Sequence, residues 1–361
     1  MFITRVCVML GEACDFKCRH CIMKDCHNSI KKVVSQKLID YLQHICDIHP
    51  AEPRNRKELV KISFWGGEPL LYFPQIREII ERVNRPQAEY SIVTNGANLT
   101  KEHVNFFNGL KNGVVFLSND GPQTDKIRDT NMLEHPEFVK LFNSINRRGI
   151  DSVIHAYNSD YKVLWNYIEN KCGHIPIAHE FLEVNWDMPS DISAINLDQY
   201  RNSCIEAAKQ CQRDILNGDL ESYPFQLFDH SIRDTIELVR KVEKNKTIEL
   251  YPRCSPYRYS SHIDLAGNMY TCHSGFAPLG NVDLGFEEIY KRCQLVINTQ
   301  ELNNRKGCEN CSVVALCKRG CPFVSGEQPG QHNMCEARRI FFNSALDIVE
   351  SFNQLLTKIE L

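Results

Sequence analysis

Three cysteines lie close together near the start of the chain, in the segment Cys14-Asp-Phe-Lys-Cys18-Arg-His-Cys21. Three thiolates at this spacing can bind one face of a 4Fe-4S cluster and ligate three of its irons, which leaves the fourth iron open to a small molecule. Zinc is the competing metal, because His20 would complete a tetrahedral site with the three thiolates. The spacing alone therefore predicts a metal site and leaves both metals open.

Seven further cysteines form a second group in the last third of the chain. Cys254 is separated by twelve residues from Gly267, which is followed after four residues by Cys272. The remaining five are Cys308, Cys311, Cys317, Cys321 and Cys335. A structural zinc ribbon built on the first four of these five is one interpretation of the spacing. The group as a whole indicates a small domain held together by metal rather than by a large core.

The chain carries 17 cysteines among 361 residues, and the rest of the sequence argues against disulfides. The stretch MFITRVCVML has no basic leader or small-residue cleavage site, and no later segment reaches the roughly 18 apolar residues of a membrane-spanning helix. We therefore expect a cytoplasmic protein, in which thiols stay reduced and clustered cysteines are more often metal ligands than disulfides.

Composition and charge place the chain among globular proteins. Hydrophobic residues make up 43% and charged residues 24%, which argues against an intrinsically disordered chain, and the length predicts about two domains. The formal net charge is -3, so charge gives no indication of nucleic acid or a membrane surface as a partner.

Short β-rich runs alternate with amphipathic helical patterns in the first half of the chain. We expect strands at residues 3–10, 59–64, 90–94, 114–118, 152–157 and 175–184. Helices are expected between them, the first capped by Ser35 and the others at residues 76–83, 102–110, 137–146 and 161–169. Six strand-helix units in succession predict a parallel sheet, either open and doubly wound or closing into an incomplete barrel.

The second half follows a different pattern. Residues 191–245 are typical of helix, with interruptions at Asn217-Gly218 and Tyr223-Pro224. Residues 251–335 are rich in Cys, Gly and Pro, and residues 336–361 return to helical spacing.

Polar and glycine-rich motifs directly follow three of the expected strands. They are Gly66-Gly67-Glu68, Thr94-Asn95-Gly96 and Ser118-Asn119-Asp120-Gly121-Pro122, with Arg128 a few residues later. The carboxyl ends of parallel strands are where α/β folds place their active sites. Glycines there would let the backbone come close enough to bond the ammonium group of a ligand, since no side chain intervenes.

These motifs carry a family resemblance. The Cys-X3-Cys-X2-Cys loop is similar to the signature of radical S-adenosylmethionine (AdoMet) enzymes, Gly66-Gly67-Glu68 resembles their GGE motif, and Ser118 to Pro122 resembles their Ser-X-Asp-Gly-Pro segment. The resemblance implies that Cys14, Cys18 and Cys21 bind a 4Fe-4S cluster, and that a reduced cluster cleaves AdoMet to methionine and a 5′-deoxyadenosyl radical. It implies AdoMet contacts from Gly66, Gly67, Glu68, Asn95, Ser118, Asp120 and Arg128.

Two of these contacts have a specific role in the resemblance. Ser118 would contact the ribose of AdoMet, and Arg128 would hold its carboxylate. Arginine suits that task because its planar guanidinium can bind a carboxylate through two hydrogen bonds.

The second cysteine group resembles the SPASM domain, an auxiliary iron-sulfur module of radical AdoMet enzymes that act on peptides and proteins. By this resemblance one auxiliary 4Fe-4S cluster is fully ligated, by Cys308, Cys311, Cys317 and Cys335. The other would be bound by Cys254, Cys272 and Cys321 only, because the family's extra upstream cysteine is missing between Cys211 and Cys254. We therefore expect three clusters, one of them with an open iron or a non-cysteine ligand.

The resemblance covers nearly the whole chain and implies an α/β fold. It predicts a partial (β/α)6 TIM-like barrel over residues 1–187, a helical bridge over 188–250, a SPASM domain over 251–340 and a C-terminal helix over 341–361.

The family resemblance favours a ribosomally made precursor peptide or a protein as substrate, modified by a cross-link, an oxidation or an epimerisation. We expect an electron donor such as flavodoxin or ferredoxin. Because the first strand starts at residue 3, we expect no leader-binding domain ahead of it, so a separate leader-binding protein is a further possible partner. Alternatives are anaerobic sulfatase maturation, dehydrogenation of a small molecule, and a non-catalytic electron-transfer protein.

Two side chains are candidates for catalysis. His273 directly follows Cys272, at the place where sulfatase-maturing relatives have an aspartate that accepts a proton from the substrate. A histidine can accept a proton near neutral pH. Glu183, on the sixth strand pattern, is a candidate substrate-facing carboxylate.

Overall fold

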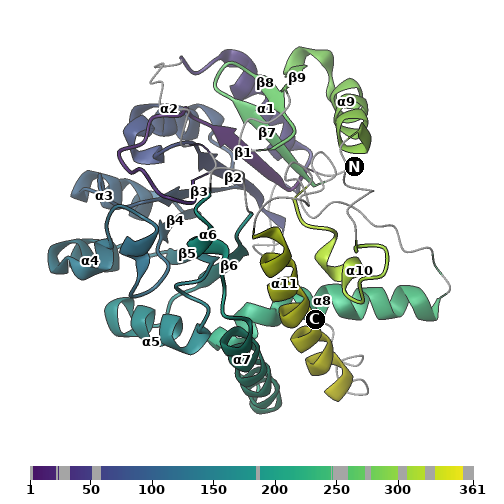
Figure 1. Ribbon diagram of the computed structural model, residues 1–361. Helices are drawn as coiled ribbons and strands as arrows, with labels where there is room; N and C mark the ends of the chain where they lie inside the picture. Colours follow the sequence, from purple (N-terminus) through teal and green to yellow (C-terminus); the bar gives the residue numbers. More distant parts are fainter. Residues whose placement is uncertain are drawn as a thin grey trace. The chain divides into compact units, whose positions relative to one another are not determined.

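The structure is a computed structural model that describes residues 3–21, 23, 33–50, 58–183, 188–244, 246, 259–272, 278–299, 307–321 and 330–352. Cys254 and His273 lie outside these residues. The chain divides into two compact units, and Figure 1 labels the helices and strands of both. Unit 1 comprises Met1–Ser118, Arg128–Gly149 and Cys254–Gln300, and unit 2 comprises Asn119–Ile127, Ile150–Arg253 and Glu301–Leu361. The chain therefore passes several times between the units, and the four predicted domain boundaries stay predictions.

Unit 1 is built on four parallel strands in sequence order, β1 (Arg5–Met9), β2 (Val60–Trp65), β3 (Ala88–Thr94) and β4 (Gly113–Ser118). Burial alternates along β2, where Val60, Ile62 and Phe64 are fully buried, as expected for a strand with one face against helices. On the other edge of β1 lies β7 (Ser260–Asp264), again parallel, followed by the antiparallel β8 (Asn268–Tyr270) and β9 (Pro278–Asn281).

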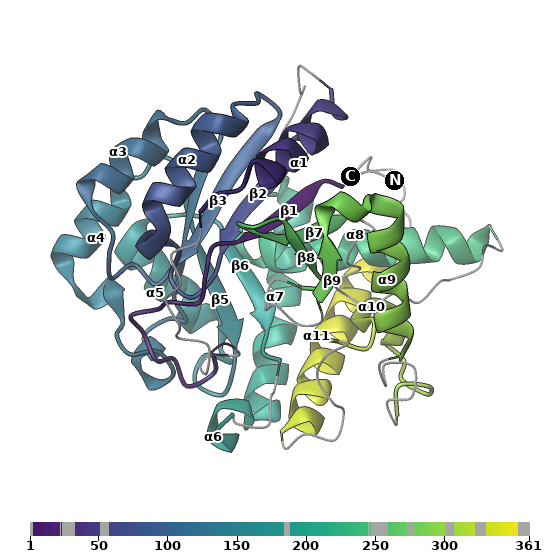
Figure 2. The same cartoon turned by 90° about the horizontal axis from the view of Figure 1, so that it is seen from above.

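The helices of unit 1 follow its strands, and α1, α2 and α3 lie on one side of β1, β2 and β3 (Figure 2). The set is α1 (Gln36–Asp47), η2 (Pro69–Tyr72), α2 (Phe73–Val83), α3 (Lys101–Gly109), η4 (Met132–Glu134), α4 (Pro136–Asn143), η5 (Val282–Leu284) and α9 (Phe286–Thr299). The predicted cap of the first helix is confirmed, because the Leu38 amide donates to Ser35 Oγ at 3.2 Å.

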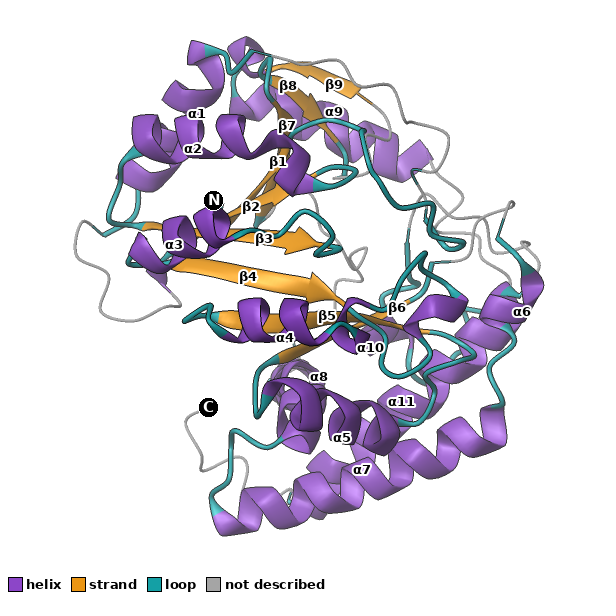
Figure 3. Cartoon of the chain, turned by 90° about the vertical axis from the view of Figure 1, so that its left-hand side faces the viewer, coloured by secondary structure: helices purple, strands orange, loops and turns teal. Residues whose placement is uncertain are grey.

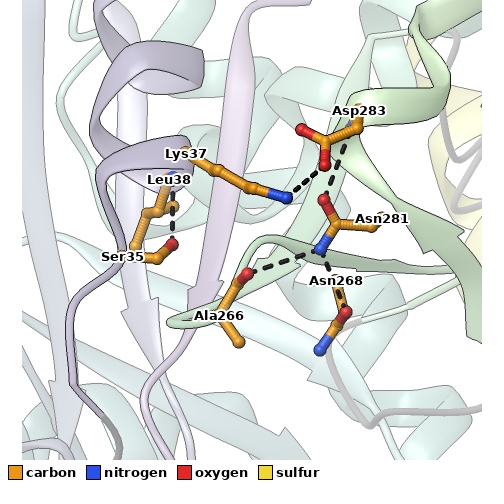
Figure 4. Close-up of polar contacts among 7 residues, drawn as sticks. All are labelled: Ser35, Lys37, Leu38, Ala266, Asn268, Asn281 and Asp283. Carbon is orange, nitrogen blue, oxygen red and sulfur yellow. Dashed lines mark hydrogen bonds and ion pairs between the residues drawn. The ribbon is translucent and has the colours of Figure 1, made fainter.

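A polar network fastens the β8–β9 hairpin of unit 1 (Figure 4). Asn281 Nδ2 donates to Asn268 Oδ1 at 3.2 Å and to Ala266 O at 3.4 Å, while its Oδ1 accepts from the Asp283 amide at 3.3 Å. Asp283 also forms an ion pair with Lys37 in the first turn of α1. The hairpin is thereby tied to the first helix of the same unit.

Unit 2 contains a parallel strand pair and a group of long helices. β5 (Arg148–Ile154), whose first two residues belong to unit 1, pairs with β6 (Ile177–Phe181) so that Ser152 lies opposite His179. The other elements are η3 (Thr124–Lys126), α5 (Tyr161–Cys172), α6 (Ser190–Ser193), α7 (Leu197–Asn217), α8 (Tyr223–Glu243), α10 (Val314–Cys317) and α11 (Gln331–Ser351).

The helices α7, α8 and α11 pack against one another (Figure 3). Aromatic rings fill the contact: Phe341 of α11 stacks on Phe228 of α8 at 5.1 Å and meets Phe181 of β6 edge-on at 5.4 Å. Such ring pairs contribute packing beyond their buried area. This apolar contact anchors α11 against the end of β6.

The alternation of strands and helices confirms the predicted α/β class with a parallel sheet. The two interruptions predicted after residue 191 are helix ends: α7 stops before Gly218, which has a φ of 74°, and α8 begins at Tyr223 with Pro224 in its first turn. None of the helices in the described part of the chain is long and apolar enough to cross a membrane.

Several predicted boundaries are wrong. The fifth strand covers 148–154 rather than 152–157, because the Asn158 side chain accepts from the His155 amide at 2.8 Å and donates to Val153 O at 2.7 Å, which turns the chain. The sixth strand ends at Phe181. The last helix begins at Gln331 rather than 336, directly after Gly330 with a φ of 80°.

Candidate functional site

The loop that carries Cys14, Cys18 and Cys21 follows β1 and runs along the end of β2. The Gly67 amide donates to Gly11 O at 3.0 Å, and the Glu68 amide donates to Ala13 O at 2.8 Å. These bonds extend the pairing of β1 and β2 beyond both strands. The first half of the cysteine loop is thereby fixed by backbone hydrogen bonds to the GGE segment.

The two glycines of this segment are required by the close approach of the loop. A Cβ on Gly66 would lie 2.4 Å from Gly11 O, and one on Gly67 would lie 2.2 Å from Ala13 O. Both obstacles are backbone atoms, which cannot rotate away as a side chain can. The sequence predicts that these glycines make room for a ligand; the structure gives them a second task, namely room for the cysteine loop itself.

Glu68 is buried between the ends of β2 and β3. Its carboxyl group accepts from the Leu70 amide at 2.9 Å, from Thr94 Oγ1 at 2.6 Å and from the Asn95 amide at 2.8 Å. Burial raises the pKa of Glu68 to about 7, although the three hydrogen bonds oppose that shift. Glu68 therefore connects two strand ends and titrates near neutral pH.

Asn95 reaches from the end of β3 to the cysteine loop. Its Nδ2 donates to Asp15 Oδ1 at 2.8 Å, and Asn98 Nδ2 donates to Asp15 Oδ2 at 2.7 Å. Asp15 directly follows Cys14, so both oxygens of this loop carboxylate are held by the β3–α3 connection. Asp15 and Asn98 are not among the predicted site residues, although the position of Asp15 between two predicted ligands is a signal for it.

Two more contacts hold the loop. The Ala13 amide donates to Tyr72 Oη at 2.9 Å, and the Lys17 amide donates to Asp129 Oδ2 at 2.9 Å. Asp129 adjoins Arg128, and the charge of Arg128 partly offsets the burial that raises the pKa of Cys18 to about 12. Arg128 therefore lies near the cysteine loop, within the same unit.

The three thiols fit one face of a 4Fe-4S cluster by their chemistry. They are soft ligands on one loop, Cys18 and Cys21 are joined by a backbone hydrogen bond of 3.1 Å, and burial also raises the pKa of Cys14 to about 11. Among the described residues, no three His, Cys, Asp or Glu side chains converge on the position of one metal ion. A cluster is bound at three separate irons, so its thiolates need not converge on one point.

Ser118 and Asp120 fall in different units. Ser118 ends β4 in unit 1 and is half-buried. Asp120 is fully buried in unit 2, where its Oδ1 accepts from the Val153 amide at 2.8 Å. Asp120 thus fixes the segment after β4 to β5. Its contact with AdoMet, like that of Ser118, stays a prediction.

Comparisons with known proteins agree with this site. Residues 4–115, which include the cysteine loop and the GGE segment, match a family model described as a 4Fe-4S single cluster domain. The radical SAM cyclopropyl synthase TigE of Paramaledivibacter caminithermalis is 25% identical over 353 residues, which cover 88% of this chain and 68% of TigE. The resemblance to radical AdoMet enzymes is confirmed.

One further relative and one solved structure are also similar to this chain. An S-adenosylmethionine-dependent nucleotide dehydratase of Flammeovirga pacifica is 25% identical over 171 residues, 42% of this chain and 57% of the dehydratase. The structure of anSMEcpe with bound AdoMet shares the fold with a TM-score of 0.68 at 16% identity, over 98% of this chain and 96% of that one. At 16% identity the match to anSMEcpe concerns the fold, whereas the family model supports a 4Fe-4S domain over residues 4–115.

Peptide complexes also occur among the solved structures with a similar fold. Streptococcus suis SuiB bound to precursor peptide SuiA has a TM-score of 0.58 at 15% identity, over 89% of this chain and 72% of that one. At this identity the likeness concerns the fold.

The cysteines predicted to bind the auxiliary clusters of a SPASM domain fall in both units. Cys272 follows β8 in unit 1, whereas unit 2 contains Cys308, Cys311, Cys317, Cys321 and Cys335. No disulfide joins any of the 15 cysteines in the described residues. Cys46, Cys204, Cys211 and Cys293 are fully buried, which agrees with packing roles for these unassigned thiols.

Glu183, the candidate carboxylate after β6, is held by an arginine. Arg338 Nη2 donates to Glu183 Oε1 at 2.6 Å and to Leu182 O at 3.3 Å. Arg338 is not among the predicted site residues. Its signal is a charged residue within the apolar spacing of the last helix, between Ala337 and Ile340.

Proposed function

We propose that this chain is a radical AdoMet enzyme that removes a hydrogen atom from a residue of a ribosomally made peptide, leading to a cross-link, an oxidation or an epimerisation. The observation that carries the proposal is the attachment of the cysteine loop to two strand ends. Gly67 and Glu68 bond its backbone, and Asn95 bonds Asp15. An electron-transfer protein needs bound thiolates but no such GGE segment beside them.

Each residue group has a separate task in this proposal. Cys14, Cys18 and Cys21 would hold the 4Fe-4S cluster, which together with AdoMet supplies the reductive radical chemistry when bound. Arg128, near the loop, would bind the carboxylate of AdoMet. Glu68 joins the end of β2 to the end of β3 beside the cysteine loop, through its hydrogen bonds with Thr94 and Asn95. The protein contributes position and exclusion of water from the reacting atoms.

A peptide substrate is supported by two of the structural neighbours. SuiB is bound to a precursor peptide, and anSMEcpe has been captured with AdoMet and a peptide named Cp18Cys. Sulfatase maturation and small-molecule chemistry are the competing reactions, the latter because one relative is a nucleotide dehydratase. The electron donor and a leader-binding partner belong to the proposal as well.

The test follows a labelled hydrogen atom. Peptides encoded beside the gene would be made with perdeuterated residues and incubated with reduced enzyme and AdoMet. We expect deuterium in the released 5′-deoxyadenosine and a changed peptide mass. A sulfatase-derived peptide and nucleotides serve as competing substrates, and the Cys14→Ala, Cys18→Ala, Cys21→Ala variant serves as the control. Deuterium transfer only from a nucleotide or a sulfatase peptide would contradict the proposal.

A further inference from the structure

One face of α11 buries polar side chains that a helix in an apolar core would not contain. Gln331, Cys335 and Arg338 follow one another at positions i, i+4 and i+7, and so share that face. Gln331 is only 2% exposed and Arg338 only 1%. Burying such groups costs free energy unless they find partners.

Some of the partners come from the protein. Gln331 Nε2 donates to Cys335 Sγ at 3.5 Å. Arg338 bonds Glu183 and Leu182, and its guanidinium lies over the Phe181 ring at 5.5 Å. Burial lowers the pKa of Arg338, but the carboxylate of Glu183 beside it raises the pKa, and a guanidinium stays charged at any physiological pH. Arg338 is therefore a permanent cation near two predicted cluster ligands, Cys317 and Cys335.

Three buried polar atoms at this place have no hydrogen-bond partner in the described part of the chain. They are Gln331 Oε1, Arg338 Nε and Glu183 Oε2. Arg338 Nε carries a hydrogen atom, and its helix places it one turn after Cys335. The sulfides and thiolates of an iron-sulfur cluster accept hydrogen bonds, so a cluster on Cys335 would supply the missing acceptor.

We propose that Arg338 is a positioning residue of the auxiliary cluster predicted on Cys308, Cys311, Cys317 and Cys335, donating its Nε hydrogen to a cluster sulfur while Glu183 balances its charge. The inference rests on the auxiliary cluster of the proposed function. It also gives Glu183 a task other than that of a substrate-facing base.

Charge near a cluster sets its reduction potential, since reduction adds a negative charge. The Arg338 cation stabilises the reduced cluster, and the Glu183 carboxylate opposes that effect. Removal of the Arg338 charge should therefore lower the reduction potential of the cluster, and removal of the Glu183 charge should raise it. A residue that only fills space would not produce two shifts of opposite sign.

The experiment measures the midpoint potential of the auxiliary clusters by redox titration with electron paramagnetic resonance. The parent is the Cys14→Ala, Cys18→Ala, Cys21→Ala variant of the full chain, which lacks the AdoMet-binding cluster. We expect Arg338→Met to shift the potential to more negative values and Glu183→Gln to shift it to more positive values. Arg338→Lys keeps the charge without the guanidinium fork, so its shift should be smaller than that of Arg338→Met.

The matched control is a half-buried arginine-carboxylate pair of the same unit, Arg233 Nε with Asp229 Oδ1 at 2.7 Å. Arg233→Met and Asp229→Asn should leave the potential unchanged. Unchanged potentials, or shifts of the same sign, in Arg338→Met and Glu183→Gln at full iron content would overturn the inference. If Arg338→Met does not fold, the midpoint potentials of Arg338→Lys and Glu183→Gln test the inference instead.

A separate variant distinguishes failure of this inference from failure of the proposed cofactors. Cys308→Ala with Cys311→Ala should lose about four irons per chain. Full iron content in that variant would show that these cysteines bind no auxiliary cluster, and the inference would fall with it. Loss of iron there, combined with unshifted potentials above, would contradict the role of Arg338 alone.

Discussion

Asn95 Nδ2 donates to Asp15 Oδ1 at 2.8 Å, which joins the end of β3 to the residue directly after Cys14. The backbone amide of the same asparagine donates to Glu68 Oε2 at 2.8 Å. One residue therefore holds both the cysteine loop and the buried carboxyl group of the GGE segment. In this chain the cysteine loop and the GGE segment therefore belong to one hydrogen-bonded network.

Breaking this link should loosen the cysteine loop. Asn95→Ala leaves the Asp15 carboxylate with Asn98 as its remaining amide partner among those described, and a lost buried hydrogen bond costs about 1–3 kcal/mol. We expect fewer irons per chain after anaerobic reconstitution and slower release of 5′-deoxyadenosine. Asn108→Ala is the control, because its side chain bonds the exposed Ser144 O at 2.9 Å and the Asn146 amide at 2.8 Å and no residue of the cysteine loop. Equal iron content in both variants would argue against the link.

The close approach at Gly67 makes an equally direct prediction. Gly67→Ala places a methyl group 2.2 Å from Ala13 O, so the loop must move, and overpacking of this kind costs about 1–3 kcal/mol. We expect a lower melting temperature and loss of the iron bound by the loop. Gly109→Ala meets nothing within 4 Å and should keep both properties. A Gly67→Ala protein with full iron content would show that the close approach of Gly67 to Ala13 O is not required for cluster binding.

Glu68 should make the stability of the cluster-free protein depend on pH. Its pKa in the fold, about 7, lies above the usual 4.5, so the fold favours the protonated carboxyl. Its contribution is fully present below about pH 4.5 and is lost as the pH rises through about 7, a change on the order of 3 kcal/mol. Urea unfolding at pH 5 and pH 8 measures most of this difference in the free energy of unfolding.

Glu68→Gln removes the titrating group, so the loss of stability between pH 5 and pH 8 should be smaller than in the unmodified protein. Glu102→Gln is the matched control, because Glu102 is exposed and pairs with Arg77 at 2.5 Å. If Glu68→Gln and the unmodified protein lose the same stability over this interval, the burial of a neutral carboxyl group is disproved.

Local features of the sequence were sufficient for the elements and the loop motifs. Ser35 caps α1 as its side-chain chemistry predicts, and Gly218 ends α7 because it tolerates a positive φ. The partners of Glu68 and Glu183 could not be predicted in this way. Glu68 bonds residues 26 and 27 positions away, and Glu183 bonds one 155 positions away, so no local periodicity reports them.

The central claim is that Cys14, Cys18 and Cys21 hold the cluster at which AdoMet is cleaved. The most direct test is release of 5′-deoxyadenosine from AdoMet by anaerobically reconstituted, dithionite-reduced protein, with iron and zinc measured in the same samples. We predict about twelve irons per chain and steady release in the unmodified protein, and about eight irons with no release in the triple alanine variant. Release by the triple variant, or stoichiometric zinc with little iron in the unmodified protein, would contradict the account.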